Sequence, residues 1–122
     1  MKWINVLFLN LLFVISSNGV AAVTKSDTKL MADDVFSACQ YQGLFYSLAA
    51  IKAMTGLDNG GVEKYGRAIM MKENEINKFV GYLKNNQDEA MLYRGGDFSS
   101  NFTQVCMLNP QKYVATYSRI FN

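Results

Sequence analysis

The sequence predicts an all-α fold, a small bundle of four or five helices around one central apolar helix and with one disulfide. The first observation is the stretch 33–54, which is apolar on nearly every helical face and has Lys52 as its only charge between Val35 and Ala53. A helix that is apolar all round must be surrounded by other elements or by lipid. The second observation is a run of apolar residues spaced seven apart. The third is a single proline and no strand-like alternation of useful length.

The first 22 residues have the layout of a secretory signal peptide. A lysine at position 2 precedes a short apolar run, a polar break and three small residues that end at Ala22. The apolar run contains two asparagines and is shorter than the ~20 residues that span a membrane. We therefore expect residues 1–22 to be cleaved after Ala22, and residues 23–122 to form one periplasmic or secreted domain with no stable membrane insertion.

Composition excludes several classes of function. Without the signal peptide the net charge is +1, so electrostatics give no reason to expect binding to nucleic acid or to an anionic membrane. The chain has no histidine, which removes the commonest general base and the commonest transition-metal ligand. No glycine-rich phosphate loop or calcium loop is present, and no pair of carboxylates stands out as catalytic. We expect a protein that is not an enzyme and that has no metal and no cofactor.

Two cysteines, Cys39 and Cys106, remain in the exported domain. An even number of cysteines in an oxidising compartment favours a disulfide. Their wide separation disfavours a redox enzyme, whose cysteines usually lie close together in sequence. Closing so long a loop stabilises the folded state by roughly 4 kcal/mol on chain-entropy grounds.

The N-terminal half predicts two long helices. Asp33 or Asp34 caps the central helix, and Gly56 ends it because glycine adopts the left-handed conformation without penalty. After a loop at 57–61, an amphipathic helix is predicted from Val62 to about Lys84. Its core stripe consists of four residues spaced seven apart, namely Val62, Ile69, Ile76 and Leu83.

Shorter elements follow. Asp88 is predicted to cap a helix at 89–93, and Ser99 or Ser100 to cap another that runs to residue 108. Asn109 and Pro110 predict the start of a last helix. Its apolar face has an aromatic residue at every fourth position, namely Tyr113, Tyr117 and Phe121.

The segment 93–102 is the candidate partner-binding site. It places Tyr93, Arg94, Phe98 and Phe102 around a glycine turn, and tyrosine and arginine are enriched among the residues that dominate binding energy. The alternative, which the usual role of aromatics favours, is that Phe98 and Phe102 are core residues beside Cys106.

Two further sets of residues fit either a binding surface or the protein core. The stripe of Tyr113, Tyr117 and Phe121 fits either a partner or homodimer contact or, more simply, the core face of a closing helix. The six methionines after the signal peptide fit either an adaptable surface or gap-filling in the core.

We expect from these observations a protein that binds another protein in the cell envelope, as an inhibitor, an immunity protein or an accessory factor. This expectation rests on protein class alone. One alternative is a stress chaperone that senses acid through carboxylates such as Glu73, Glu75, Asp88 and Glu89. The other is a carrier of a small ligand or lipid, with an apolar cavity between its helices.

Overall fold

A computed structural model describes residues 30–121, so the predicted signal peptide and its cleavage site lie outside the described residues. The described chain forms seven helices and no strand, which confirms the all-α prediction. Across this part of the chain, no helix combines the length and apolar character needed to cross a membrane.

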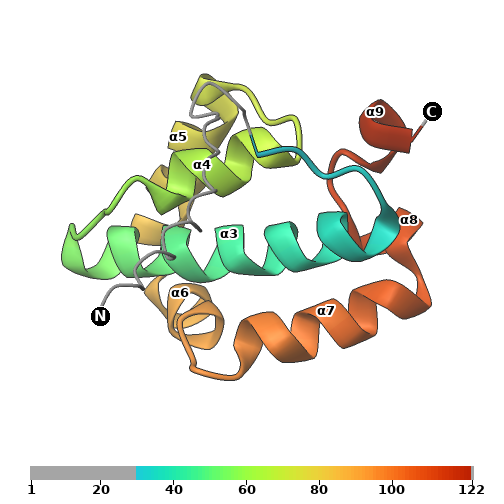
Figure 1. The fold of residues 1–122 in the computed structure, drawn as a ribbon. Coiled ribbons are helices and arrows are strands. Elements are labelled where there is room, and N and C mark those ends of the chain that lie inside the picture. Colours follow the sequence, from blue (N-terminus) through green and yellow to red (C-terminus); the bar gives the residue numbers. More distant parts are fainter. Residues whose placement is uncertain (1–29, 122) are drawn as a thin grey trace, which may run out of the picture.

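The central helix, α3 (Val35–Thr55), has the other helices packed around it (Figure 1). The predicted caps are confirmed. The Asp34 carboxylate accepts a hydrogen bond of 2.7 Å from the backbone N–H of Ser37, and Gly56 ends the helix with a φ of 78°. These caps satisfy backbone groups that a helix leaves without partners at its two ends.

The predicted helix at 62–84 is two helices, α4 (Gly61–Ala68) and α5 (Glu73–Lys84), so its continuity was predicted wrongly. Between them Met70 has a φ of 69°. The Glu75 carboxylate then accepts a hydrogen bond of 2.8 Å from the backbone N–H of Lys72, which gives α5 its own N-terminal cap.

The residues of the predicted apolar stripe lie in the core despite this break. All four of its residues are at most 3 % exposed: Val62, Ile69, Ile76 and Leu83. The core positions were therefore predicted correctly, because each helix keeps its apolar side toward the interior.

The next two helices, α6 (Gln87–Tyr93) and α7 (Phe98–Leu108), begin two or three residues earlier than predicted. Asn86 and Asp97 occupy their cap positions without a side-chain cap bond, so none of the predicted residues is a cap: Asp88, Ser99 and Ser100. In Figure 1, α7 lies along the outside of α3, and the two helices run in opposite directions.

The predicted last helix is also broken, into α8 (Pro110–Tyr113) and α9 (Tyr117–Phe121). Pro110 is the first residue of α8 after Asn109, as predicted. Val114 ends α8 in an extended conformation and is 3 % exposed. The hydroxyl of the buried Thr116 donates a hydrogen bond to the backbone carbonyl of Ile69. These two buried anchors hold the chain out of helical geometry between α8 and α9.

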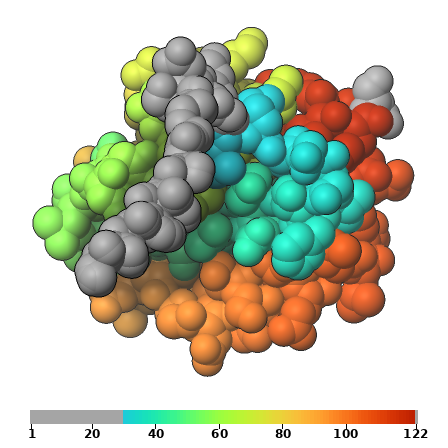
Figure 2. Space-filling view, in the orientation of Figure 1, coloured from blue at the N-terminus to red at the C-terminus, as the bar shows by residue number. Residues whose placement is uncertain are grey.

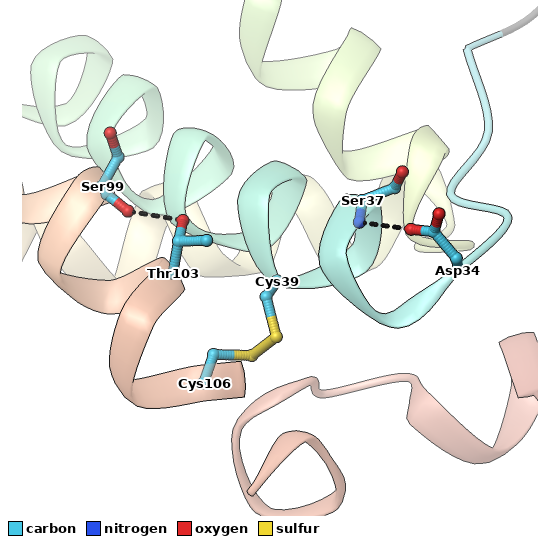
Figure 3. Close-up of a disulfide and its surroundings, with 6 residues drawn as sticks. All are labelled: Asp34, Ser37, Cys39, Ser99, Thr103 and Cys106. Carbon is cyan, nitrogen blue, oxygen red and sulfur yellow. Dashed lines mark hydrogen bonds between the residues drawn. A yellow bond between two sulfur atoms is a disulfide. The ribbon is translucent and has the colours of Figure 1, made fainter. Parts of the chain in front are cut away.

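The predicted disulfide joins Cys39 of α3 to Cys106 of α7, with a Cα–Cα separation of 5.7 Å (Figure 3). Both cysteines are completely buried. Near them, α3 and α7 approach so closely that a Cβ added to Gly43 would lie 3.1 Å from the backbone oxygen of Ser99. The disulfide and this close approach fix α7 against the central helix.

Candidate functional site

The predicted binding segment forms the corner between α6 and α7. Three of its four candidate residues, Tyr93, Phe98 and Phe102, are half-buried. Their rings surround the ring of Tyr46 on α3, at centroid distances of 5.2, 6.3 and 5.4 Å respectively. Such aromatic contacts contribute packing energy beyond the area that they bury. These three side chains therefore support the corner.

Polar contacts fix the end of α6 as well. The Ser47 hydroxyl of α3 donates a hydrogen bond of 2.7 Å to the backbone carbonyl of Tyr93. The Tyr93 hydroxyl donates to one carboxylate oxygen of Glu89, and the Tyr82 hydroxyl of α5 donates to the other at 2.5 Å. Glu89 thus connects α5 to α6.

This arrangement shifts the pKa values of its members. The hydrogen bonds from Tyr82 and Tyr93 stabilise the charged carboxylate and hold the pKa of Glu89 below its ordinary value. Burial, followed by the hydrogen bond to Glu89, raises the pKa of Tyr93. Around neutral pH the cluster is therefore one carboxylate held by two neutral phenols.

Two apolar side chains and one cation face outward at this corner. Met91 and Leu92 of α6 are 60 % and 71 % exposed, and Arg94, the fourth predicted residue, is exposed just after the half-buried Tyr93. We call Met91, Leu92 and Arg94 the corner surface. In Figure 2, α6 and α7 (orange) form one continuous surface along the lower edge of the molecule.

Of the four predicted residues only Arg94 belongs to the corner surface, because Met91 and Leu92 lie just before the predicted segment. Leu92 was not among the predicted site residues, and Met91 was considered only as one of the scattered methionines. A signal was present in the sequence. If Ala90 and Tyr93 face inward on a short helix, the two residues between them must face outward. Ala90 is fully buried, as this periodicity requires.

The second predicted surface belongs to the core. Tyr113, Tyr117 and Phe121 lie on two different helices and pack against the cluster of buried residues around the disulfide. The ring of Tyr113 meets Phe102 edge-on at 6.1 Å, and Tyr117 contacts Phe121 at 5.0 Å. The aromatic stripe closes the bundle.

The methionines are divided between core and surface. Met54 and Met71 pack against the core. The other four are 38–60 % exposed: Met31, Met70, Met91 and Met107.

Charged side chains of the other helices form ion pairs. These are Lys52 with Asp58 at 3.0 Å, Arg67 with Glu63 at 2.6 Å, and Arg119 with Glu75 at 3.6 Å. Within residues 30–121, no group of three or more acidic, cysteine or histidine side chains is placed to hold a metal ion.

Two hollows flank α3 and both are open to solvent. One, of about 380 Å³, lies between α3 and the loop before α4, and its lining includes Leu48, Ile51 and Leu57. The other, of about 330 Å³, lies between α3 and α7, and Phe36, Leu44 and Thr103 contribute to it. Ligand pockets bury most of the surface of their ligand, and neither of these hollows is enclosed.

No protein-family model, curated protein or solved structure matches this chain.

Proposed function

We infer that this protein binds another protein through the corner surface, in the cell envelope, and acts there as an inhibitor, an immunity protein or an accessory factor. The observation that carries the proposal is the exposure of Met91 and Leu92 beside Arg94. Methionine and arginine are among the residues enriched at protein interfaces.

The side-chain contacts that hold α6 in place beneath the corner surface favour tight binding. Tyr93 stacks on Tyr46, and Glu89 holds Tyr93 and Tyr82 together. The backbone that presents the three exposed residues is therefore ordered before a partner arrives. A preordered surface loses less conformational entropy on binding, so more of the contact energy contributes to affinity.

The proposed location rests on two features. The first 22 residues have the composition of a signal peptide. The disulfide between Cys39 and Cys106 supports a compartment in which disulfides persist, such as the bacterial periplasm or the extracellular space. N-terminal sequencing of the protein recovered from its source organism should begin at Val23.

The proposal is tested with matched leucine-to-arginine variants. Leu92→Arg places a second cation on the corner surface, whereas Leu57→Arg makes the same change at a site 70 % exposed in the loop between α3 and α4. The wild-type protein, with its disulfide intact, is used to capture partners from an envelope extract of the source organism. The captured protein is then purified and titrated by calorimetry against all three forms.

We expect one partner at a fixed stoichiometry. Leu92→Arg should weaken its binding at least tenfold, since burying an unpaired arginine charge in an interface costs more than ~1.4 kcal/mol. Leu57→Arg should bind like the wild type. Equal binding by all three forms would place the interface elsewhere, and the absence of a stoichiometric partner would contradict the proposed function.

A further inference from the structure

The loop between α3 and α4 (green, at the left of Figure 1) contains an asparagine followed by a glycine, Asn59 and Gly60. Within residues 30–121 no other asparagine precedes a glycine. In such a pair the backbone nitrogen of the glycine can attack the side-chain amide of the asparagine, and the missing Cβ leaves that approach open. Both residues are exposed, so water reaches them. The pair is therefore a candidate for a reaction within the chain itself.

Two hydrogen bonds involve the atoms that would react. The Gly60 N–H, whose nitrogen is the nucleophile of this reaction, donates to Oδ1 of Asp58 at 2.9 Å. The Gly61 N–H donates to Oδ1 of Asn59, the oxygen on which negative charge develops, also at 2.9 Å. A general base must lie within hydrogen-bond reach of the proton that it removes, and a donor aimed at a developing oxyanion lowers the barrier. Both groups are in place in this loop.

We propose that the loop converts its own Asn59 to aspartate and isoaspartate through a cyclic imide, with Asp58 as the catalytic base and the Gly61 N–H as the oxyanion donor. A bond forms between the Gly60 nitrogen and Cγ of Asn59, and the bond from that carbon to Nδ2 breaks. The proton of Gly60 passes through Asp58 to the leaving nitrogen, which departs as ammonia. Water then opens the imide at either of its two carbonyls, so water is the only other reactant.

Lys52 of α3 holds the base in position. Its ammonium group lies 3.0 Å from Oδ2 of Asp58, while the other carboxylate oxygen, Oδ1, accepts the hydrogen bond from Gly60. The hydrogen bond from Lys52, followed by the one from Gly60, lowers the pKa of Asp58. The carboxylate is therefore ionised at neutral pH and fixed against the N–H group that must lose its proton.

The reaction changes both the charge and the backbone where α4 begins. Either product adds one negative charge directly before Gly60, the N-cap of α4, and the helix dipole favours a negative charge there. Isoaspartate also inserts one methylene group into the main chain. Because Asn59 lines the open hollow beside Leu48 and Leu57, the modification places a new charge at the rim of that hollow.

The rate at residue 59 tests the proposal. The disulfide-bonded protein is incubated at neutral pH and physiological temperature, and peptide mass spectrometry follows the mass gained when an amide becomes a carboxylate. Asp58→Asn keeps an oxygen that can accept the hydrogen bond from Gly60 but removes the base. It should slow the reaction at least about tenfold, because general-base catalysis typically contributes ~10²–10⁴-fold. Fragmentation distinguishes residue 59 from the new asparagine at position 58.

Lys52→Gln is the matched control, since it removes the same ion pair and leaves the base. Without Lys52 the pKa of Asp58 rises, so the carboxylate is a stronger base and the reaction should be as fast as in the wild type or faster. In guanidinium chloride, where both hydrogen bonds are lost, the wild type should react at least about tenfold more slowly than the folded protein.

Several results would overturn the proposal. They are an Asn59 that stays unmodified, a folded protein that reacts no faster than the unfolded one, and an Asp58→Asn variant that reacts like the wild type. Equal slowing in Asp58→Asn and Lys52→Gln would also overturn it, because the ion pair would then act only by ordering the loop. The corner surface takes no part in this reaction, so Leu92→Arg should react at the wild-type rate and the two proposals fail separately.

Discussion

The disulfide should contribute a large share of the free energy of unfolding. Replacing both Cys39 and Cys106 with alanine removes a covalent link between residues 67 apart in sequence. Chain-entropy arguments give about 4 kcal/mol for a loop of this length. A small domain has a total stability of only ~5–15 kcal/mol, so the variant should unfold at a much lower denaturant concentration.

The loss should be concentrated in α7. Cys106 is the only residue of α7 that is fully buried, so the disulfide is its deepest attachment to the core. By contrast, α4 and α5 each retain several buried residues, among them Val62 of α4 and Leu83 of α5. Amide protons of α7 should therefore lose more protection from exchange than those of α4 and α5.

Urea unfolding of the wild type and of the double alanine variant, without reductant, measures the effect. With a urea slope of ~1–2 kcal/mol/M, a loss of 4 kcal/mol lowers the midpoint by about 2–4 M. A loss below about 1 kcal/mol, or an equal loss of protection in all helices, would show that packing alone fixes α7.

Two further predictions concern the corner and the backbone. Tyr93→Phe removes one of the two hydrogen bonds to Glu89 and should lower the free energy of unfolding by about 1 kcal/mol at pH 7. Because these bonds lower the pKa of Glu89, the stabilisation exists above its ordinary pKa and is lost as the pH falls through the folded value. Urea midpoints of wild type and Tyr93→Phe should therefore converge as the pH falls below the ordinary carboxyl range, and a constant difference would refute this role. Gly56→Ala should destabilise by about 1 kcal/mol, since φ is 78° there, whereas Gly81→Ala, inside α5 with open space at its Cβ, should stabilise by about 0.5–1 kcal/mol. Shifts of the same sign in thermal melting would contradict the backbone argument.

Hydrophobic periodicity predicted the core well. The stripe from Val62 to Leu83 is buried, and the apolar α3 is the centre of the bundle. The break at Met70 was not predictable from local composition, because residues 67–80 include neither glycine nor proline. Glu75 caps the second of these helices, α5, but in the sequence it was interpreted as one of several exposed charges.

The prediction of one continuous last helix was wrong for a different reason. An aromatic residue at every fourth position is compatible with one continuous helix, and it is equally compatible with two short helices joined at a buried residue. Only tertiary contacts decide between them. Val114 enters the core and Thr116 bonds to a carbonyl 47 residues away.

The sequence predicted a binding segment at residues 93–102, and the corner surface overlaps that segment only at Arg94. Composition identified the segment from Tyr93 to Phe102 as aromatic and turn-rich. It did not reveal that these rings contact Tyr46 of α3, which is far away in the sequence. The exposed residues are consequently the apolar pair that precedes Tyr93.

The most direct test of partner binding is the calorimetric comparison of wild type, Leu92→Arg and Leu57→Arg against the protein captured from the envelope. We predict that Leu92→Arg binds at least tenfold more weakly while its urea midpoint stays at the wild-type value, because Leu92 is 71 % exposed. Unchanged affinity in Leu92→Arg would contradict the account, since it would show that the corner surface does not contact the partner.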